Sequence, residues 1–232
     1  MKYETSVSEI IERTHDVKSF RFNRAQGFDY DPGQFLFVTI LSEGKKITKH
    51  FTISSSPTEK ECIEFTKKIT DHEFSVALDR LKIGDRAYLD GPYGDFAFKG
   101  EYPRVGMITG GIGITPLRSM IKYCTDEGMK SRITFLYGNR NQESIVFKEE
   151  LDHLKKLNQN LRVIHTLSQP DEKWTGRRGH IDVQMVLEEI PDYEECVFYV
   201  CGPPSLVKNS VEILKTLKIQ DDMIHKENFP GY

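Results

Sequence analysis

The chain has 232 residues, a length that accommodates one large domain or two small ones. Hydrophobic residues make up 38% of the sequence, and 32 Lys and Arg residues nearly balance 35 Asp and Glu residues, which is typical of a globular protein and excludes pervasive disorder. The formal net charge of -3 provides no excess positive charge for nucleic acid or an anionic membrane surface, so we expect neither partner.

The sequence also lacks membrane, secretion and metal signals. The longest strongly apolar stretch, residues 35–41, is far shorter than the ~20 residues of a membrane-spanning helix. Residues 1–16 carry charges throughout and contain no secretory apolar run, so we expect a cytoplasmic protein. The cysteines form no CxxC pair and the histidines form no HxH or HExxH pair. We therefore expect reduced thiols, no metal site and no iron–sulfur cluster.

The first hundred residues contain short β-rich segments separated by turns. Strands are expected at Tyr3–Arg13, Val17–Phe22, Phe35–Leu41, His50–Ser54, Cys62–Ile69 and Arg86–Leu89. A short helix is expected at Phe74–Leu81. Six closely spaced strands predict a small antiparallel β-barrel.

After residue 100 the pattern changes to alternating strands and helices. Strands are expected at Arg104–Thr109, Ile133–Tyr137, Leu161–Leu167 and Val197–Cys201, and helices at Pro116–Glu127, Val146–Leu157, Val183–Glu189 and Ser205–Leu217. The predicted fold is α+β with two domains: an antiparallel six-stranded β-barrel followed by a doubly wound α/β domain with a parallel sheet. We place the boundary near Gly100–Pro103, which gives domains of residues 1–100 and 101–232.

A glycine-rich turn follows the first strand of the predicted α/β half and opens its first helix. It reads GGIGITP from Gly110 to Pro116, and Gly110, Gly111 and Gly113 allow a pyrophosphate to approach the backbone. Thr115 is expected to cap the helix and Pro116 suits its first turn, which leaves the amino end of the helix facing an anion. The turn matches neither GxGxxG nor a Walker loop. A glycine-rich connection without a ligand is the alternative.

Arg140 follows the second α/β strand, where an acidic residue would suit the ribose hydroxyls of NAD. An arginine there suits a 2′-phosphate instead, so the sequence leans toward NADPH. A solvated surface arginine is an equal alternative, and Arg177 and Arg178 compete for the same role.

Four segments occur in the order and at the spacing of the ferredoxin-NADP reductase family, which the chain resembles over nearly its whole length. They are Lys49–Pro57, Gly110–Pro116, Cys201–Pro204 and Glu227–Tyr232. The resemblance implies that FAD, rather than FMN, binds to the barrel and that NADPH or NADH binds to the α/β half as cosubstrate.

The first segment corresponds to the family pattern Arg-x-Tyr-Ser/Thr, with two of its three defining residues substituted. The resemblance implies that Lys49 binds the flavin pyrophosphate, that Phe51 presents an aromatic face to the isoalloxazine, and that Thr52 hydrogen-bonds flavin N5. His50, inside the segment, belongs to the same expected flavin-binding set.

Ser75 matches the serine of the family's next flavin-phosphate segment, although His72 stands where the family commonly has glycine. The resemblance implies that Ser75 contacts the flavin phosphate, and a simple helix-start hydroxyl is the alternative role.

In the second half, the resemblance implies that the glycine-rich turn lines the phosphates of the pyridine nucleotide. Cys201, Gly202 and Pro203 belong to a CGPP segment that is expected beside the nicotinamide, at the carboxyl end of a parallel strand. A buried structural thiol is the alternative for Cys201.

The last six residues are ENFPGY, and the resemblance implies that an aromatic residue there covers the flavin. Tyr232 or Phe229 is therefore expected against the ring face that nicotinamide must reach, with a frayed tail as the alternative. Thr52, Cys201, Glu227 and Tyr232 form the expected catalytic set.

The function implied is that of a flavin-dependent NAD(P)H oxidoreductase that transfers hydride between nicotinamide and FAD and exchanges single electrons with a separate redox protein. Because no cluster-binding cysteine set is present, the expected partner is an external ferredoxin, flavodoxin or oxygenase component. A free-flavin or ferric reductase and a non-catalytic nucleotide-sensing module are the alternatives.

Overall fold

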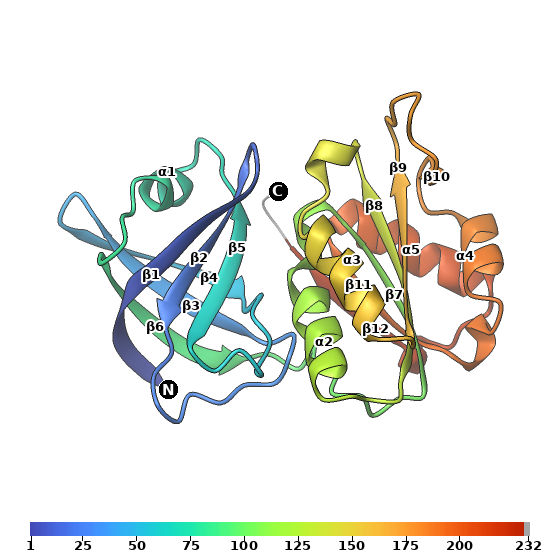
Figure 1. Cartoon of the computed structure of the whole chain (residues 1–232), viewed down its shortest axis with the longest axis horizontal. Coiled ribbons are helices and arrows are strands. Elements are labelled where there is room, and N and C mark those ends of the chain that lie inside the picture. Colours follow the sequence, from blue (N-terminus) through green and yellow to red (C-terminus); the bar gives the residue numbers. More distant parts are fainter. Residues whose placement is uncertain (230–232) are drawn as a thin grey trace.

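Two six-stranded sheets lie side by side, each with its own hydrophobic core, in the computed structural model, which describes residues 1–229 (Figure 1). The first sheet contains β1 (Lys2–Thr14), β2 (Val17–Asn23), β3 (Phe35–Ser42), β4 (Lys45–Thr52), β5 (Cys62–Lys68) and β6 (Arg86–Tyr93), and α1 (Glu73–Asp79) follows β5. The second sheet contains β7 (Arg104–Gly110), β8 (Arg132–Asn139), β9 (Leu161–Leu167), β10 (Arg177–Arg178), β11 (Val197–Gly202) and β12 (Ile224–Asn228).

Four α-helices and four short 3₁₀ helices belong to the second half of the chain over residues 1–229. The α-helices are α2 (Ile114–Asp126), α3 (Lys148–Leu157), α4 (Val183–Glu189) and α5 (Pro204–Thr216). The 3₁₀ helices are η1 (Gly111–Gly113), η2 (Gln142–Ser144), η3 (Tyr193–Glu195) and η4 (Asp221–Met223).

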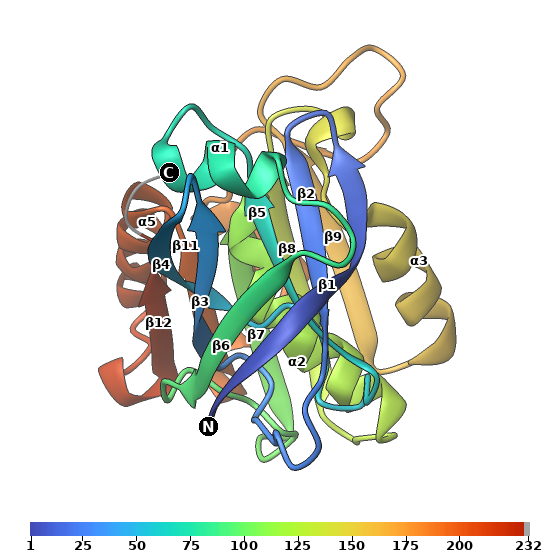
Figure 2. The same ribbon diagram turned by 90° about the vertical axis from the view of Figure 1, so that its left-hand side faces the viewer.

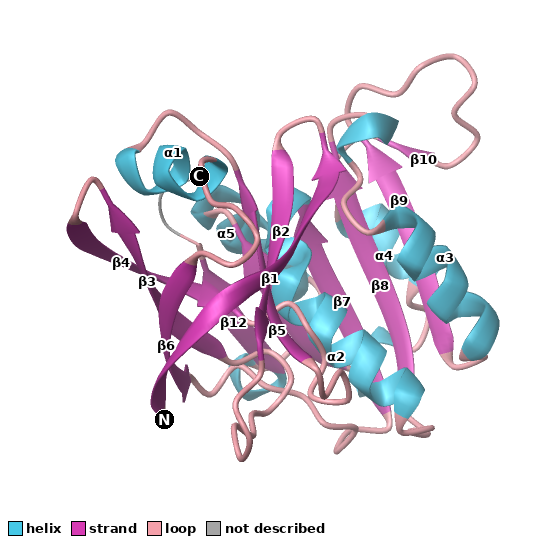
Figure 3. Ribbon diagram, turned by 60° about the vertical axis from the view of Figure 1, so that its left-hand side comes forward, coloured by secondary structure: helices cyan, strands magenta, loops and turns pink. Residues whose placement is uncertain are grey.

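The first sheet is antiparallel with strand order β4-β3-β6-β1-β2-β5. Alternation along β3 buries Leu36 and Val38 in the barrel core and leaves Phe37 38% exposed on the outer face. Because β4 and β5 are the two edges of this sheet, the predicted six-stranded barrel is an open one. α1 covers one end of it (Figure 3) and packs Phe74 against Phe51 of β4, with ring centroids 5.5 Å apart.

The second sheet is parallel with strand order β10-β9-β8-β7-β11-β12, so the order reverses between β7 and β11. α2 and α3 cover one face and α4 and α5 cover the other (Figure 1). β7 contributes to both layers, because Met107 packs with the first helix pair and Ile108 with the second. A doubly wound sheet of this kind binds ligands beyond the carboxyl ends of its strands at the point of reversal.

Several elements differ from the sequence expectation. The strand expected at His50–Ser54 is β4, Lys45–Thr52, because it pairs with β3 from Ser42 opposite Lys45 to Phe35 opposite Thr52. β10 and β12 were not expected, since both are polar edge strands without apolar alternation.

Seen from the side of the first sheet, β1, β3 and β6 stand in front of the second sheet (Figure 2). None of the helices formed by residues 1–229 has both the length and the apolar composition of a membrane-spanning segment.

Candidate functional site

A cavity of about 890 Å³ lies where the edge of the first sheet meets the second half of the chain. Its walls are residues 47–52 of β4, Thr66 and Lys67 of β5, residues 72–75 at the start of α1, Thr115 of α2, residues 227–229, and Phe35 and Phe37 of β3. Of the predicted site residues, the structure brings together Lys49, His50, Phe51, Thr52, Ser75, Thr115 and Glu227. Tyr232 lies outside the described residues.

The end of β4 forms one wall of the cavity because β4 is an edge strand, so one side of it has no neighbouring strand. Phe51 is 7% exposed and stacks on Phe65 with ring centroids 4.5 Å apart. One face of Phe51 is thus covered, and only its remaining surface contributes to the wall. Thr52, the last residue of β4, is half-buried and pairs with Phe35.

Two lysines supply positive charge to the cavity. Lys49 is exposed on β4, and Lys67 projects from β5, the opposite edge of the same sheet. Burial and then the nearby charge of Lys49 lower the pKa of Lys67. Two lysines that line one cavity favour an anionic ligand there. Lys67 was not in the predicted set, although it lies in a strand that the sequence predicted.

Ser75 lies in the first turn of α1 and is fully buried. Its hydroxyl oxygen accepts a hydrogen bond from the backbone N–H of Thr70 at 2.9 Å. The hydroxyl hydrogen remains available to a ligand, because a serine hydroxyl both donates and accepts. Contact between Ser75 and a flavin phosphate stays a prediction.

The glycine-rich turn has a different local structure from the one expected. η1 runs directly into α2, whose N-cap is Gly113 and has no side-chain cap. The expectation that Thr115 caps this helix was therefore wrong: Thr115 lies in its first turn, 3% exposed, and lines the cavity, with Pro116 beside it.

The glycines of this turn do two different things. Gly111 has φ +53° and open space within 4 Å of where a Cβ would be, so a ligand can approach its backbone. A Cβ on Gly113 would lie 2.7 Å from the Cα of Gly202, so this glycine allows the turn to contact β11. Gly110 is the last residue of β7 and the first residue of the turn, and Pro203 follows β11.

Cys201 lies beneath the turn and does not line the cavity. It is fully buried, and its thiol donates to the carbonyl of Gly113 at 3.1 Å. Burial raises the pKa of this thiol well above its ordinary value, so Cys201 stays protonated. The hydroxyl of Thr109 donates to the carbonyl of Cys201 at 2.6 Å, which ties β7 to β11 at the strand-order reversal.

Two acidic residues, Glu73 of α1 and Glu227, line the cavity, and Glu227 is the one that belongs to the second half of the chain. It pairs in register with Cys201 and lies on β12, and its Oε2 atom is buried without a hydrogen-bond partner among the described residues. Burial raises the pKa of Glu227 to about 7. Phe229 also lines the cavity, and its N–H donates to the carbonyl of Gly202 at 2.8 Å.

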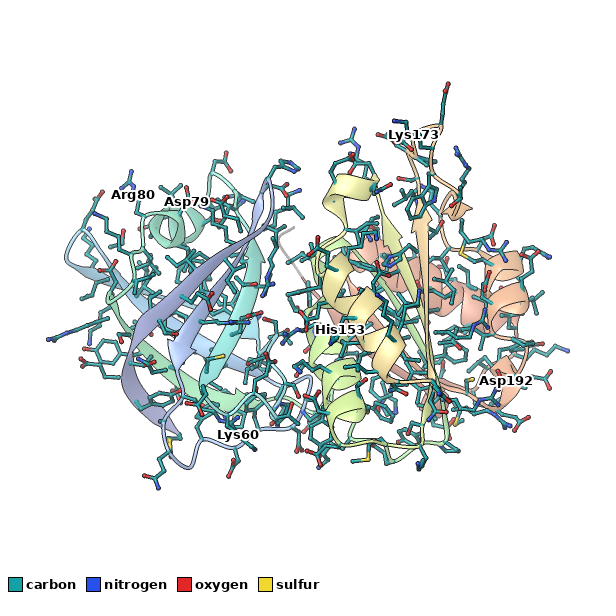
Figure 4. The ribbon with its side chains drawn as sticks, in the orientation of Figure 1. Lys60, Asp79, Arg80, His153, Lys173 and Asp192 are labelled. Atoms are coloured by element: carbon teal, nitrogen blue, oxygen red, sulfur yellow. The ribbon has the colours of Figure 1, made fainter. Side chains whose placement is uncertain are left out.

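Arg140 is exposed beyond the end of β8 and does not line the cavity, and its Nε donates to Gln169 Oε1 at 2.8 Å. Its two competitors are occupied elsewhere. Arg177 pairs with Glu188 and Glu189, and Arg178 donates to backbone carbonyls of the projecting loop before β10, which carries Lys173 (Figure 4).

The protein thus has the fold and the cavity of a two-domain flavin- and pyridine-nucleotide-binding protein. Residues 4–98 match the model of the oxidoreductase FAD-binding domain, and residues 107–212 match that of the oxidoreductase NAD-binding domain. The chain belongs to the ferredoxin-NADP reductase family of FAD- and NAD(P)-binding oxidoreductases.

Relatives and solved structures agree with this assignment. The chain is 30% identical to NADH-cytochrome b5 reductase 1 of Candida glabrata, over 90% of this chain and 78% of that protein. It is 31% identical to the glycine betaine monooxygenase reductase subunit of Chromohalobacter salexigens, over 95% of this chain but only 62% of that subunit.

Two solved structures share the fold over almost the entire chain. The cytochrome b5 reductase domain of Ulva prolifera nitrate reductase has a TM-score of 0.85 at 22% identity, covering 98% of this chain and 97% of that domain. A ferredoxin NADP+ reductase from Neisseria gonorrhoeae has a TM-score of 0.82 at 17% identity, covering 98% of each chain.

The residues of the cavity fit FAD. Lys49 and Lys67 suit a pyrophosphate, and the unpaired Glu227 oxygen and the half-buried Thr52 offer polar groups to a ring system. When bound, FAD supplies both two-electron hydride chemistry and one-electron transfer. The open backbone at Gly111 suits the phosphates of the nucleotide cosubstrate.

Proposed function

We propose that this protein is an FAD-dependent NAD(P)H oxidoreductase that accepts hydride from nicotinamide and passes single electrons to a separate redox protein. The observation that supports this proposal is that one cavity is lined by Thr52 from the first sheet and by Thr115 and Glu227 from the second half. In this proposal β4 would hold the flavin and the turn before α2 would hold the nucleotide, and alignment of two bound reactants would remove much of the barrier.

The side chains of the chain have positioning and proton-handling roles in this proposal. Thr52 would donate a hydrogen bond from its hydroxyl to flavin N5, and Lys49 would hold the pyrophosphate. Because the pKa of Glu227 is about 7, its carboxyl group can take up or release a proton in the cavity near neutral pH. Cys201, protonated and bonded to Gly113, supports the turn from below and provides no nucleophile.

The proposed electron acceptor is an oxygenase component or another small redox protein, such as a ferredoxin or flavodoxin. The names of two relatives support a separate acceptor. One is the monooxygenase reductase subunit, and the other is a component of the Na(+)-translocating NADH-quinone reductase of Yersinia enterocolitica, 36% identical over 96% of this chain and 59% of that component. Cytoplasmic localisation stays a prediction of the sequence.

The choice of coenzyme has support on both sides. NADH appears in the names of two relatives, which favours NADH. Arg140 is exposed beyond β8, where its guanidinium could bind a 2′-phosphate, which favours NADPH. A comparison of NADH with NADPH therefore decides between them.

Steady-state oxidation of NADH and NADPH with ferricyanide as acceptor tests the proposal. We expect turnover by protein that retains its FAD through gel filtration. Activity that requires added free flavin, together with loss of FAD on the column, would favour the free-flavin reductase. Turnover with ferric chelates but not with ferricyanide would favour the ferric reductase. No oxidation of either nucleotide by FAD-loaded protein would favour the sensing module.

A further inference from the structure

Arg118 of α2 is 2% exposed and bonds across to the barrel. Its Nη1 donates to the carbonyl of Ser54 at 2.7 Å and to Glu59 Oε2 at 2.6 Å, and its Nη2 donates to Glu59 Oε1 at 3.3 Å. The next residue of α2, Ser119, donates its hydroxyl to the carbonyl of Ser55 at 2.6 Å. Two consecutive residues of α2 thus hold two consecutive residues of the barrel.

These contacts lie close to the cavity on both sides. Ser54 is two residues after Thr52, and the N–H groups of Ile53 and Ser54 donate to backbone carbonyls of the barrel. Arg118 is three residues after Thr115, which is nearly one turn of α2, so the two lie on the same side of the helix. A short, hydrogen-bonded path therefore joins Thr52 to the nucleotide-binding turn.

Arg118 also belongs to a set of three arginines and three glutamates, of which Arg118 and Glu64 are buried and the other four are partly exposed. It forms an ion pair with Glu150 of α3 at 2.7 Å, and the fully buried Glu64 bonds to Arg13 at 3.1 Å and Arg21 at 2.8 Å. Burial acts to raise the pKa of Glu64, but these arginines, with Arg118 first among them, hold its pKa below the usual value.

One aromatic ring completes the contact between the two halves. The guanidinium carbons of Arg13, from β1, and of Arg118 lie 4.6 Å and 5.3 Å from the centroid of Phe147, the residue before α3. A buried ion pair adds little net stability compared with apolar packing, whereas its directional bonds select one geometry. Such a cluster is better suited to fixing the orientation of the halves than to strengthening the fold.

We infer that Arg118 is a positioning residue, which sets the spacing between Thr52 and the nucleotide-binding turn and thereby the rate of hydride transfer to the flavin. This inference rests on the proposed function. Arg118 does not line the cavity and is only 2% exposed, so it has almost no surface with which to contact either reactant. Its effect is expected in the hydride-transfer step and not in the affinity for nucleotide.

The first experiment compares Arg118→Met with Arg21→Met as a matched control. Arg21 bonds to Glu64 and to Glu9 of β1, so it belongs to the same charge cluster. Both of these partners belong to the first sheet, so these bonds do not link the two halves of the chain. FAD-loaded proteins are mixed anaerobically with NADH or NADPH, and flavin absorbance is followed by stopped flow.

Arg118→Met is expected to lower the limiting rate of flavin reduction by roughly 10- to 100-fold, with less than about a threefold change in the dissociation constant of the nucleotide. The long-wavelength absorbance of stacked nicotinamide and flavin should weaken in parallel. In Arg21→Met, the limiting rate of flavin reduction should stay within about threefold of the wild-type rate. Wild-type rates in Arg118→Met, or equal losses in both variants, would overturn the inference.

A second variant separates positioning from folding. Arg118→Met leaves Glu59 and Glu150 without their shared cation, which destabilises the fold, and Arg118→Met with Glu59→Gln removes one of the two unpaired charges while keeping an acceptor for the N–H of Ser56. The double variant should regain melting temperature but not rate. Recovery of both would show that Arg118 acts through stability alone and would overturn the inference.

Failure of the proposed function is distinguishable from failure of this inference. Wild-type flavin that neither nucleotide reduces would refute the proposed function. The link between the halves is then measured by hydrogen exchange in α2 and residues 53–55, which should accelerate in Arg118→Met and not in Arg21→Met. Unchanged exchange in Arg118→Met would overturn the inference whether or not the flavin is reduced.

Discussion

Cys201 and Glu227 are paired in register on β11 and β12, yet the thiol is buried under the glycine-rich turn while the carboxyl lines the cavity. The structure therefore separates two residues that the sequence placed together in one catalytic set. The Cys201 thiol bonds to the carbonyl of Gly113, and Glu227 is the member of the pair that lines the cavity.

Glu227→Gln should remove a pH dependence. In the wild type, the rate of flavin reduction should change with pH, with an apparent pKa near 7. In the variant, the rate should stay constant between about pH 6 and about pH 8. Stopped-flow rates across this range give the measurement. An unchanged profile in the variant would assign the titration to another group.

The same substitution should change stability with a defined sign. The pKa of Glu227 is raised to about 7 from an ordinary 4.5, so the stability that the neutral carboxyl contributes at low pH is lost as the pH rises through 7. Glu227→Gln should match the wild type near pH 4 and exceed it at about pH 8 by on the order of 1 to 3 kcal/mol. Thermal unfolding at both pH values measures this, with the exposed Glu172→Gln as control.

Thr52→Ala should slow flavin reduction much more than it weakens FAD binding. Loss of one hydroxyl hydrogen bond corresponds to about a tenfold lower limiting rate. Thr52→Ser keeps the hydroxyl and should retain most of the rate. Equal reduction rates in all three proteins would remove Thr52 from the mechanism.

Lys49→Ala should lower FAD occupancy, because a charge-assisted contact to the pyrophosphate is worth on the order of 1.5 to 3 kcal/mol. Lys45→Ala is the control, since Lys45 lies on the same strand outside the cavity. The ratio of flavin to protein absorbance after gel filtration measures occupancy. Full occupancy in Lys49→Ala would mean that other residues, Lys67 first, hold the phosphate.

Arg140→Ala should raise the KM for NADPH by roughly tenfold and leave that for NADH within about twofold. The physical reason is that only NADPH carries the 2′-phosphate that an exposed arginine beyond β8 can bind. The KM for NADH, measured on the same variant, is the control. Equal effects on both would exclude Arg140 from 2′-phosphate recognition.

The sequence predicted both sheets because strand and helix periodicity are local signals. It did not predict that the barrel stays open, since that depends on whether β4 and β5 pair across the chain. β12 was missed because its residues His225, Lys226 and Glu227 show no apolar alternation, and the strand forms by pairing with β11.

The site was predicted where motifs are contiguous and missed where contacts are distant. Thr52 and Thr115 belong to short segments that the sequence identified, and they do line one cavity. Arg118 bonds to Ser54 and Glu59, which lie 64 and 59 residues away in the chain, and no local pattern encodes such contacts. Lys67 was missed for a similar reason, because its neighbour Lys49 belongs to another strand.

The most direct test of the central claim is an absorbance spectrum of the purified protein followed by anaerobic titration with NADH and, separately, with NADPH. We predict flavin bands that bleach with one nucleotide in preference to the other. A colourless protein that also fails to take up added FAD or FMN, or a bound flavin that neither nucleotide bleaches, would contradict the proposed function.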